Sequence, residues 1–110
     1  MSAITNEKLI RTARKAANLK EVDKDVRIGG VGCALISSRG RIYKGTSVHA
    51  CCGVGFCAEY GAIAAMLTNR DYQIKKIAAV SDEGAVMPPC GKCRELMYEI
   101  NQKNLQADVI

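Results

Sequence analysis

Two of the six cysteines in this chain are separated by only two residues, a spacing that lets both thiols bind one metal ion. Cys90 and Cys93 stand where a helix is predicted to begin, at the start of residues 91–102. The positive end of a helix favours the thiolate form that binds metals. Pro89 has no N–H to donate and therefore suits the residue just before a helix.

Cys57 stands at the start of a second predicted helix, residues 57–67, after a glycine-containing loop. If both helices begin at the same edge of a parallel sheet, their first turns bring Cys57 to Cys90 and Cys93. Three protein ligands leave one tetrahedral position of zinc open for water, as in catalytic sites, whereas structural zinc usually has four. The pattern therefore predicts a catalytic zinc site.

Glu59 is the one charged residue in the apolar segment 57–67. It lies close enough to Cys57 to reach a metal-bound water, whose pKa zinc lowers toward neutrality. We therefore expect Glu59 to be the catalytic residue that takes a proton from this water and delivers it to the substrate.

Each part of this pattern has a simpler interpretation when taken alone. A Cys-x-x-Cys pair also occurs in redox and structural-metal sites, Cys57 could be a core thiol, and Glu59 could pair with the positive end of its helix. The combination favours catalytic zinc, because Cys-Ala-Glu and Pro-Cys-x-x-Cys each follow a loop and begin a helix, about 30 residues apart.

The other cysteines are interpreted as structural. Cys33 lies in a predicted buried strand and suits a small core residue. Cys51 and Cys52 fall in a predicted loop, where we favour packing near a subunit contact over an extra metal site with His49, the only histidine. His49 as a fourth zinc ligand would close the site and make it structural.

Length and composition indicate one domain over residues 1–110. With 48% apolar residues the chain can form one core, and no stretch is long enough to span a membrane. No signal peptide is recognised, so we expect a cytoplasmic protein whose cysteines bind metal rather than form disulfides. The net charge of +5 includes a basic run with helical spacing, which we interpret as a solvated helix face. One Phe and four Tyr give few platforms for base stacking, so nucleic acid is not an expected partner. Without a membrane-length apolar stretch, a membrane is not an expected partner either.

The pattern of apolar residues predicts an α/β fold. Strand–helix–strand alternation from residue 41 onward favours a three-layer α-β-α arrangement with a central mixed sheet. Residues 18–27 are expected to be a polar linker, 46–56 irregular and 81–89 a loop. The predicted elements are a helix at 3–19, a hairpin of strands 31–36 and 41–44, a helix at 57–67, a strand at 74–80, a helix at 91–102 and a strand at 107–110.

Three segments resemble the cytidine deaminase superfamily: residues 57–59, residues 89–96 and the strand at 31–35. The similarity runs from about residue 5 to the end of the chain. Cys57 stands at the position of the first metal ligand, and a Cys there resembles the small branch of the family that contains cytidine deaminase and blasticidin S deaminase. Nucleic-acid editors and deoxycytidylate deaminases usually have His there.

The resemblance implies one zinc ion per subunit, held by Cys57, Cys90 and Cys93. It implies that Glu59 moves a proton from the zinc-bound water to ring N3 and then to the leaving amino group, as hydroxide attacks C4 and ammonia departs. It also implies that the backbone N–H of Ala58 helps to hold the pyrimidine, and that the protein is a homo-oligomer, a tetramer or a dimer.

Some positions differ from the family pattern. Where cytidine deaminases bind ribose with Asn-x-Glu, this chain has Ser47 and His49, which can still hydrogen-bond a hydroxyl but lack a carboxylate. Where many members have Arg after the Glu, this chain has Tyr60. Arg94 and the N-termini of the two helices are therefore expected to offset the excess thiolate charge. The family usually continues with a further strand and tail beyond the last predicted strand.

These observations favour deamination of a cytosine nucleoside, cytidine or deoxycytidine, to its uridine product. The alternative within the same chemistry is blasticidin S or another aminopyrimidine compound, which the substitutions at positions 47, 49 and 60 favour. A further alternative is a non-catalytic zinc protein that keeps the fold.

Overall fold

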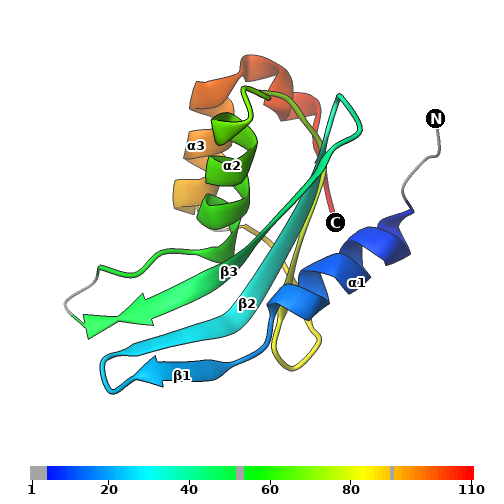
Figure 1. The fold of residues 1–110 in the computed structure, drawn as a ribbon. Helices are drawn as coiled ribbons and strands as arrows, with labels where there is room; N and C mark the ends of the chain where they lie inside the picture. Colours follow the sequence, from blue (N-terminus) through cyan, green and yellow to red (C-terminus); the bar gives the residue numbers. More distant parts are fainter. Residues whose placement is uncertain (1–4, 52–53, 90) are drawn as a thin grey trace.

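A mixed β-sheet forms the middle layer of the computed structural model, which describes residues 5–51, 54–89 and 91–110 (Figure 1). Helix α1 covers one face of the sheet, and helices α2 and α3 cover the other. This confirms the predicted three-layer α/β fold. The elements are α1 (Asn6–Ala16), β1 (Lys20–Asp23), β2 (Val26–Ser37), β3 (Ile42–Ala50), α2 (Ala58–Thr68), β4 (Ile74–Ser81), β5 (Val86–Met87), α3 (Gly91–Ile100), the 3-10 helix η2 (Gln102–Gln106) and β6 (Asp108–Val109).

Strand β2 is the centre of the sheet and pairs antiparallel with β1, β3 and β4. Because β3 and β4 both run antiparallel to β2, they point in the same direction. Strand β4 also pairs with β5, antiparallel, and with β6, parallel. Helix α2 follows β3, and α3 follows β4 through β5. The two helices therefore begin at the same edge of the sheet, as the predicted metal site requires.

Helix α1 lies on the sheet through a stripe of small and apolar residues. The Thr5 hydroxyl oxygen caps its N-terminus by accepting a hydrogen bond from the Lys8 N–H at 3.1 Å. Leu9 and Ala13 are buried against apolar side chains of β2 and β4. Gly32 of β2 permits this contact, because a Cβ there would lie 2.0 Å from the carbonyl oxygen of Ala13.

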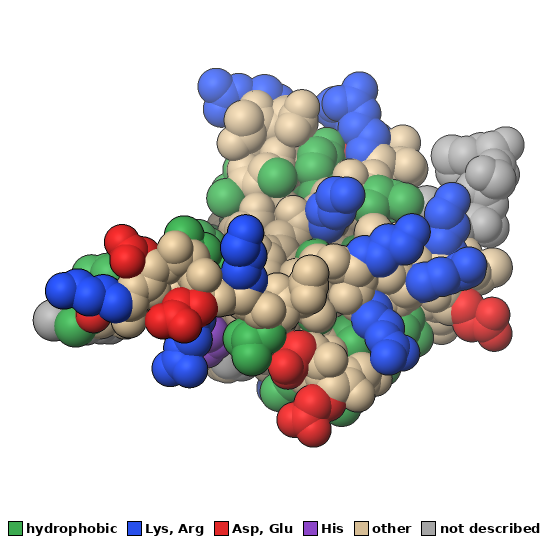
Figure 2. Space-filling view, turned by 60° about the horizontal axis from the view of Figure 1, so that its bottom comes forward, with side chains coloured by type: hydrophobic (Ala, Val, Ile, Leu, Met, Phe, Trp, Pro, Cys, Tyr) green, Lys and Arg blue, Asp and Glu red, His purple; other side chains and the backbone are tan. Residues whose placement is uncertain are grey.

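The basic side chains of α1 face outward. Those of Lys8, Arg11, Arg14 and Lys15 are exposed, as expected for a solvated helix face. On the side of the molecule drawn in Figure 2, lysine and arginine side chains are spread widely, with acidic side chains among them. No helix among the described residues has the length and apolar character needed to cross a membrane.

Helix α2 approaches β3 unusually closely at Gly45. A Cβ at Gly45 would lie 2.5 Å from the carbonyl oxygen of Ala58 and 2.5 Å from the backbone nitrogen of Ala62. Such distances leave no room for a side chain, so the backbone of the first turns of α2 rests directly on the strand. Ala62, Ile63 and Met66 complete this contact within the main core cluster. The position of α2 is thus set by a glycine in β3.

Substituting Gly45 with alanine is expected to destabilise the fold by about 1–3 kcal/mol, because the added methyl group overpacks a backbone contact. Gly61 lies on the other side of the same contact and is the matched control. A Cβ there would lie 3.4 Å from the Gly45 Cα, which is ordinary contact, and alanine is the better helix former. Urea unfolding of both variants measures the difference; a Gly45→Ala protein as stable as Gly61→Ala would contradict this interpretation.

The sheet is more extensive than predicted from the sequence. Residues 46–50, expected to be irregular, continue β3 by pairing with the first half of β2, as in the partners Val26 and Ala50. The expected polar linker contains β1, whose side chains are all exposed, and the expected loop at 81–89 contains β5. These three expectations were wrong because none of these strand segments has a buried apolar side chain to mark it, and backbone pairing specifies the strands. Helix α3 ends at Ile100, and η2 follows it.

Candidate active site

The segment before α2 is bound to the sheet at Phe56, the residue that precedes the N-cap of the helix. Phe56 forms two backbone hydrogen bonds of 2.9 Å with Val48 of β3, one donated by each residue. Gly55 permits this approach, because a Cβ there would lie 2.1 Å from the Val48 carbonyl oxygen. Cys57 follows as the N-cap of α2, with extended backbone, and its carbonyl oxygen accepts the Tyr60 N–H at 3.1 Å. The start of α2 is thus held against the end of β3.

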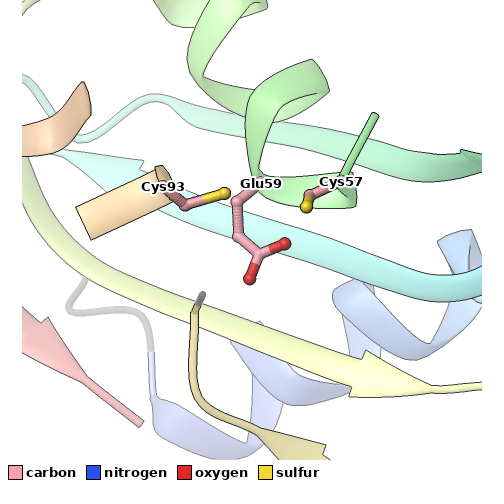
Figure 3. Close-up of side chains that lie close together, drawn as sticks. All are labelled: Cys57, Glu59 and Cys93. Atoms are coloured by element: carbon pink, nitrogen blue, oxygen red, sulfur yellow. The ribbon is translucent and has the colours of Figure 1, made fainter. Parts of the chain in front are cut away.

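Cys57, Glu59 and Cys93 converge where α2 and α3 begin (Figure 3). The two sulfur atoms and a carboxylate oxygen of Glu59 all lie within 4.8 Å of one another. Cys93 is fully buried, Glu59 is 5% exposed and Cys57 is half-buried. Cys90 lies outside the described residues, so its role as a ligand stays a prediction.

This group fits a zinc ion. With Zn–S distances of about 2.3 Å and tetrahedral angles, two thiolate ligands lie about 3.8 Å apart. The separations within the group are compatible with that value. Thiolates are also the ligands that zinc prefers in proteins, and the N-termini of two helices stabilise their negative charge.

Cys33 of β2 is a fully buried thiol outside this group. Burial, and secondarily the negative charge of Glu59, raise its pKa far above the usual value of a thiol. The prediction that Cys33 is a core residue is confirmed by its burial.

A cavity of about 460 Å³ adjoins the group and reaches from it to the end of β3. This volume is in the range of small-molecule sites. Apolar side chains supply much of its wall, and Glu59 and Cys57 also line it. The lining includes Val31, Ser47, His49, Phe56, Ala58 and Met87. The arrangement places a carboxylate and a thiol beside a space for one small ring with a substituent.

The three predicted substrate-binding residues all line this cavity. Ser47 is 4% exposed, and its hydroxyl oxygen accepts the Val31 N–H at 3.0 Å. His49 is exposed on the same strand, two residues further along. Ala58 is the first residue of α2, and the first N–H groups of a helix have no acceptor within the helix. Their contacts with a substrate stay predictions.

Arg94 and Lys92 lie on different cavities. Arg94 is exposed and lines a smaller cavity of about 260 Å³, together with Met97 and Leu105. Lys92 lines the cavity beside Glu59, and its Nζ lies 4.7 Å from the centre of the Tyr60 ring. Sequence reasoning did not single out Lys92, although its place between two predicted ligands was a usable signal.

Comparisons with known proteins agree with this geometry. The family model described as "Cytidine and deoxycytidylate deaminase zinc-binding region" matches residues 3–108. A cytidine deaminase of Mycobacterium tuberculosis is 30% identical over 79 residues, which cover 71% of this chain and 59% of that protein. One from Halalkalibacterium halodurans is 32% identical over 87 residues, covering 72% of this chain and 66% of that protein. The chain thus spans less than two thirds of the length of these relatives.

Solved structures show the same fold. The crystal structure of cytidine deaminase from Mycobacterium tuberculosis superimposes with a TM-score of 0.80 at 23% identity, covering 98% of this chain and 85% of the other. That of cytidine deaminase from Burkholderia pseudomallei gives a TM-score of 0.76 at 26% identity, covering 96% and 83%.

Proposed function

This chain belongs to the cytidine and deoxycytidylate deaminase family, and we propose that it is a zinc-dependent hydrolytic deaminase of a cytosine nucleoside. The observation that carries the proposal is the convergence of Cys57, Glu59 and Cys93 beside the 460 Å³ cavity. The reaction replaces the amino group on C4 of the ring with oxygen, consuming one water and releasing one ammonia.

The metal ligands in this proposal are Cys57, Cys93 and, from the sequence, Cys90, with one zinc per subunit. When bound, zinc supplies the Lewis acidity that lets a water react at neutral pH. Only Ala58 separates Cys57 from Glu59. The Glu59 carboxylate therefore lies beside the metal ligands and does not itself have to bind the metal. Glu59 is only 5% exposed and lines the cavity, so its carboxylate is accessible from the cavity and is otherwise enclosed by the protein.

Glu59 has three tasks in the reaction. Its carboxylate accepts a proton from the attacking water, and the resulting acid donates that proton to ring N3. As the C4–N bond breaks, Glu59 carries the second proton of the water to the leaving amino group, which departs as ammonia. The carboxylate ends ionised, as it began, so one residue completes the cycle.

The cavity wall holds the ring in this proposal. The Ala58 N–H, at the positive end of α2, donates to a polar atom of the pyrimidine. Phe56 and Val31 contribute apolar contacts to the cavity that exclude water. Ser47 and His49 lie toward the end of β3, where they bind the substituent on the ring.

Blasticidin S or another aminopyrimidine compound is the second candidate substrate. The Ser47 oxygen already accepts the Val31 N–H, so its remaining capacity favours donation of its own proton to the substrate. His49 brings no carboxylate acceptor for ribose hydroxyls. Ser47 and His49 therefore favour a substrate whose ring substituent carries hydrogen-bond acceptors.

Other predictions concern the whole protein and remain proposals. We propose a single domain over residues 1–110, a cytoplasmic location, small-molecule partners rather than nucleic acid or membrane, and a homo-oligomer, a tetramer or a dimer. Exposed apolar side chains around the smaller cavity, those of Leu105 and Val109, support self-association.

Ammonia release from a panel of substrates tests the function. Zinc-loaded protein is incubated with cytidine, deoxycytidine, cytosine and blasticidin S, and the products are followed by absorbance. We expect turnover of at least one nucleoside. If Ser47 and His49 select the substituent of blasticidin S instead of ribose, we expect turnover of blasticidin S. Protein that binds one zinc and deaminates none of the four would favour the non-catalytic alternative.

A further inference from the structure

Lys92 is the only lysine or arginine among the described residues that line the 460 Å³ cavity. It belongs to the first turn of α3, directly before Cys93, whose side chain points into the group at Glu59. A cation in this place lines the same cavity as Cys57 and Glu59. Lys92 is itself exposed, so its side chain is not required to fill the core.

Tyr60 fixes the position of the Lys92 charge. The ammonium group lies 4.7 Å from the centre of the Tyr60 ring, within the range of a cation–π interaction. Tyr60 follows Glu59 directly and is tied to Cys57 by its backbone hydrogen bond. The pair therefore bridges the first turns of α2 and α3, the two turns that bring Cys57 and Cys93 together.

The proposed metal site carries an excess of negative charge. Three thiolates against one Zn²⁺ leave a net charge of about −1, and an ionised Glu59 adds another. In a partly buried site such charges interact more strongly than in water, so a nearby cation stabilises the loaded site. Arg94 lines the smaller cavity and not this one, so Lys92, and not Arg94, shares a cavity with Cys57 and Glu59.

We infer that Lys92, held over the ring of Tyr60, is the positioning residue that offsets the thiolate charge of this site, in place of Arg94. The inference rests on the proposed function, because it requires the three-thiolate zinc site. It assigns Tyr60 a specific task, to hold a lysine of the neighbouring helix beside the ligands. The positive charge comes from α3 and the aromatic ring from α2.

The test is the zinc affinity of the purified protein, measured by competition with a coloured chelator and independent of activity. Lys92→Met removes the charge and keeps most of the side-chain length, and we expect it to weaken zinc binding about tenfold or more. Lys92→Arg and Tyr60→Phe keep the charge and the ring, respectively, and should remain within about threefold of the wild type. Tyr60→Leu should lose affinity to an intermediate degree.

Arg94→Met is the matched comparison, because it removes the same charge two residues away on the same helix. We expect its zinc affinity to stay within about twofold of the wild type. Circular dichroism of the metal-free variants checks that each one is folded. Equal affinity of Lys92→Met and the wild type would overturn the inference, as would an equal loss in Arg94→Met. Wild-type protein that binds no stoichiometric zinc would remove the proposed function as well, so the two failures are distinguishable.

Discussion

Glu59→Gln is expected to keep its zinc and to lose turnover by about three orders of magnitude or more. Glutamine has nearly the shape of glutamate, so the packing of this buried side chain is preserved. It cannot accept a proton from water or return it to the substrate, so each proton transfer assigned to Glu59 fails. The measurement is kcat with the best substrate, together with zinc content from the same preparation.

Glu83→Gln is the control for this substitution. Glu83 is an exposed acidic residue in the turn before β5, away from the group. Its variant should match the wild type in both zinc content and kcat. If Glu59→Gln turned over substrate as fast as Glu83→Gln, Glu59 would have no part in proton transfer.

Cys93→Ala is expected to lower zinc content from one ion per chain to nearly none. The substitution removes one of three proposed protein ligands, and two thiols do not hold zinc against a chelator as three do. Activity should be lost with the metal. Metal analysis after dialysis against a weak chelator gives the answer directly.

Cys33→Ala is the matched variant, because Cys33 is also a fully buried thiol. It lies outside the group of Cys57, Glu59 and Cys93, so its loss should leave zinc content unchanged. The cost is expected to be about 1 kcal/mol of stability, from the buried volume that the sulfur filled. If Cys33→Ala lost zinc while Cys93→Ala kept it, the ligand assignment would be wrong.

The parts of the site that depend on helix starts could be predicted from the sequence. Cys57 and Cys93 are far apart in the chain, but each follows a strand, and the two strands are parallel. Helices that follow parallel strands begin at one sheet edge, so the convergence follows from topology. The spacing of apolar residues identified both helices, β4 and the first half of β3, whereas residues 46–50 of β3 were missed.

The parts that depend on tertiary contacts could not be predicted. Lys92 and Arg94 flank Cys93 at about 100° to either side of it around the helix. Which of the two side chains reaches the cavity depends on the positions of α2 and β5 relative to α3. The sequence of α3 alone does not specify these positions. The exposed strand β1 was missed for a related reason, because its register comes from β2 and not from a pattern of buried residues.

X-ray absorption at the zinc edge tests the central claim most directly, because it counts the atoms around the metal in the purified protein. We predict three sulfur atoms at about 2.3 Å and one oxygen at about 2.0 Å, the three thiolates and one open position filled by water. Four protein ligands around the metal, or fewer than three sulfur atoms, would contradict the account.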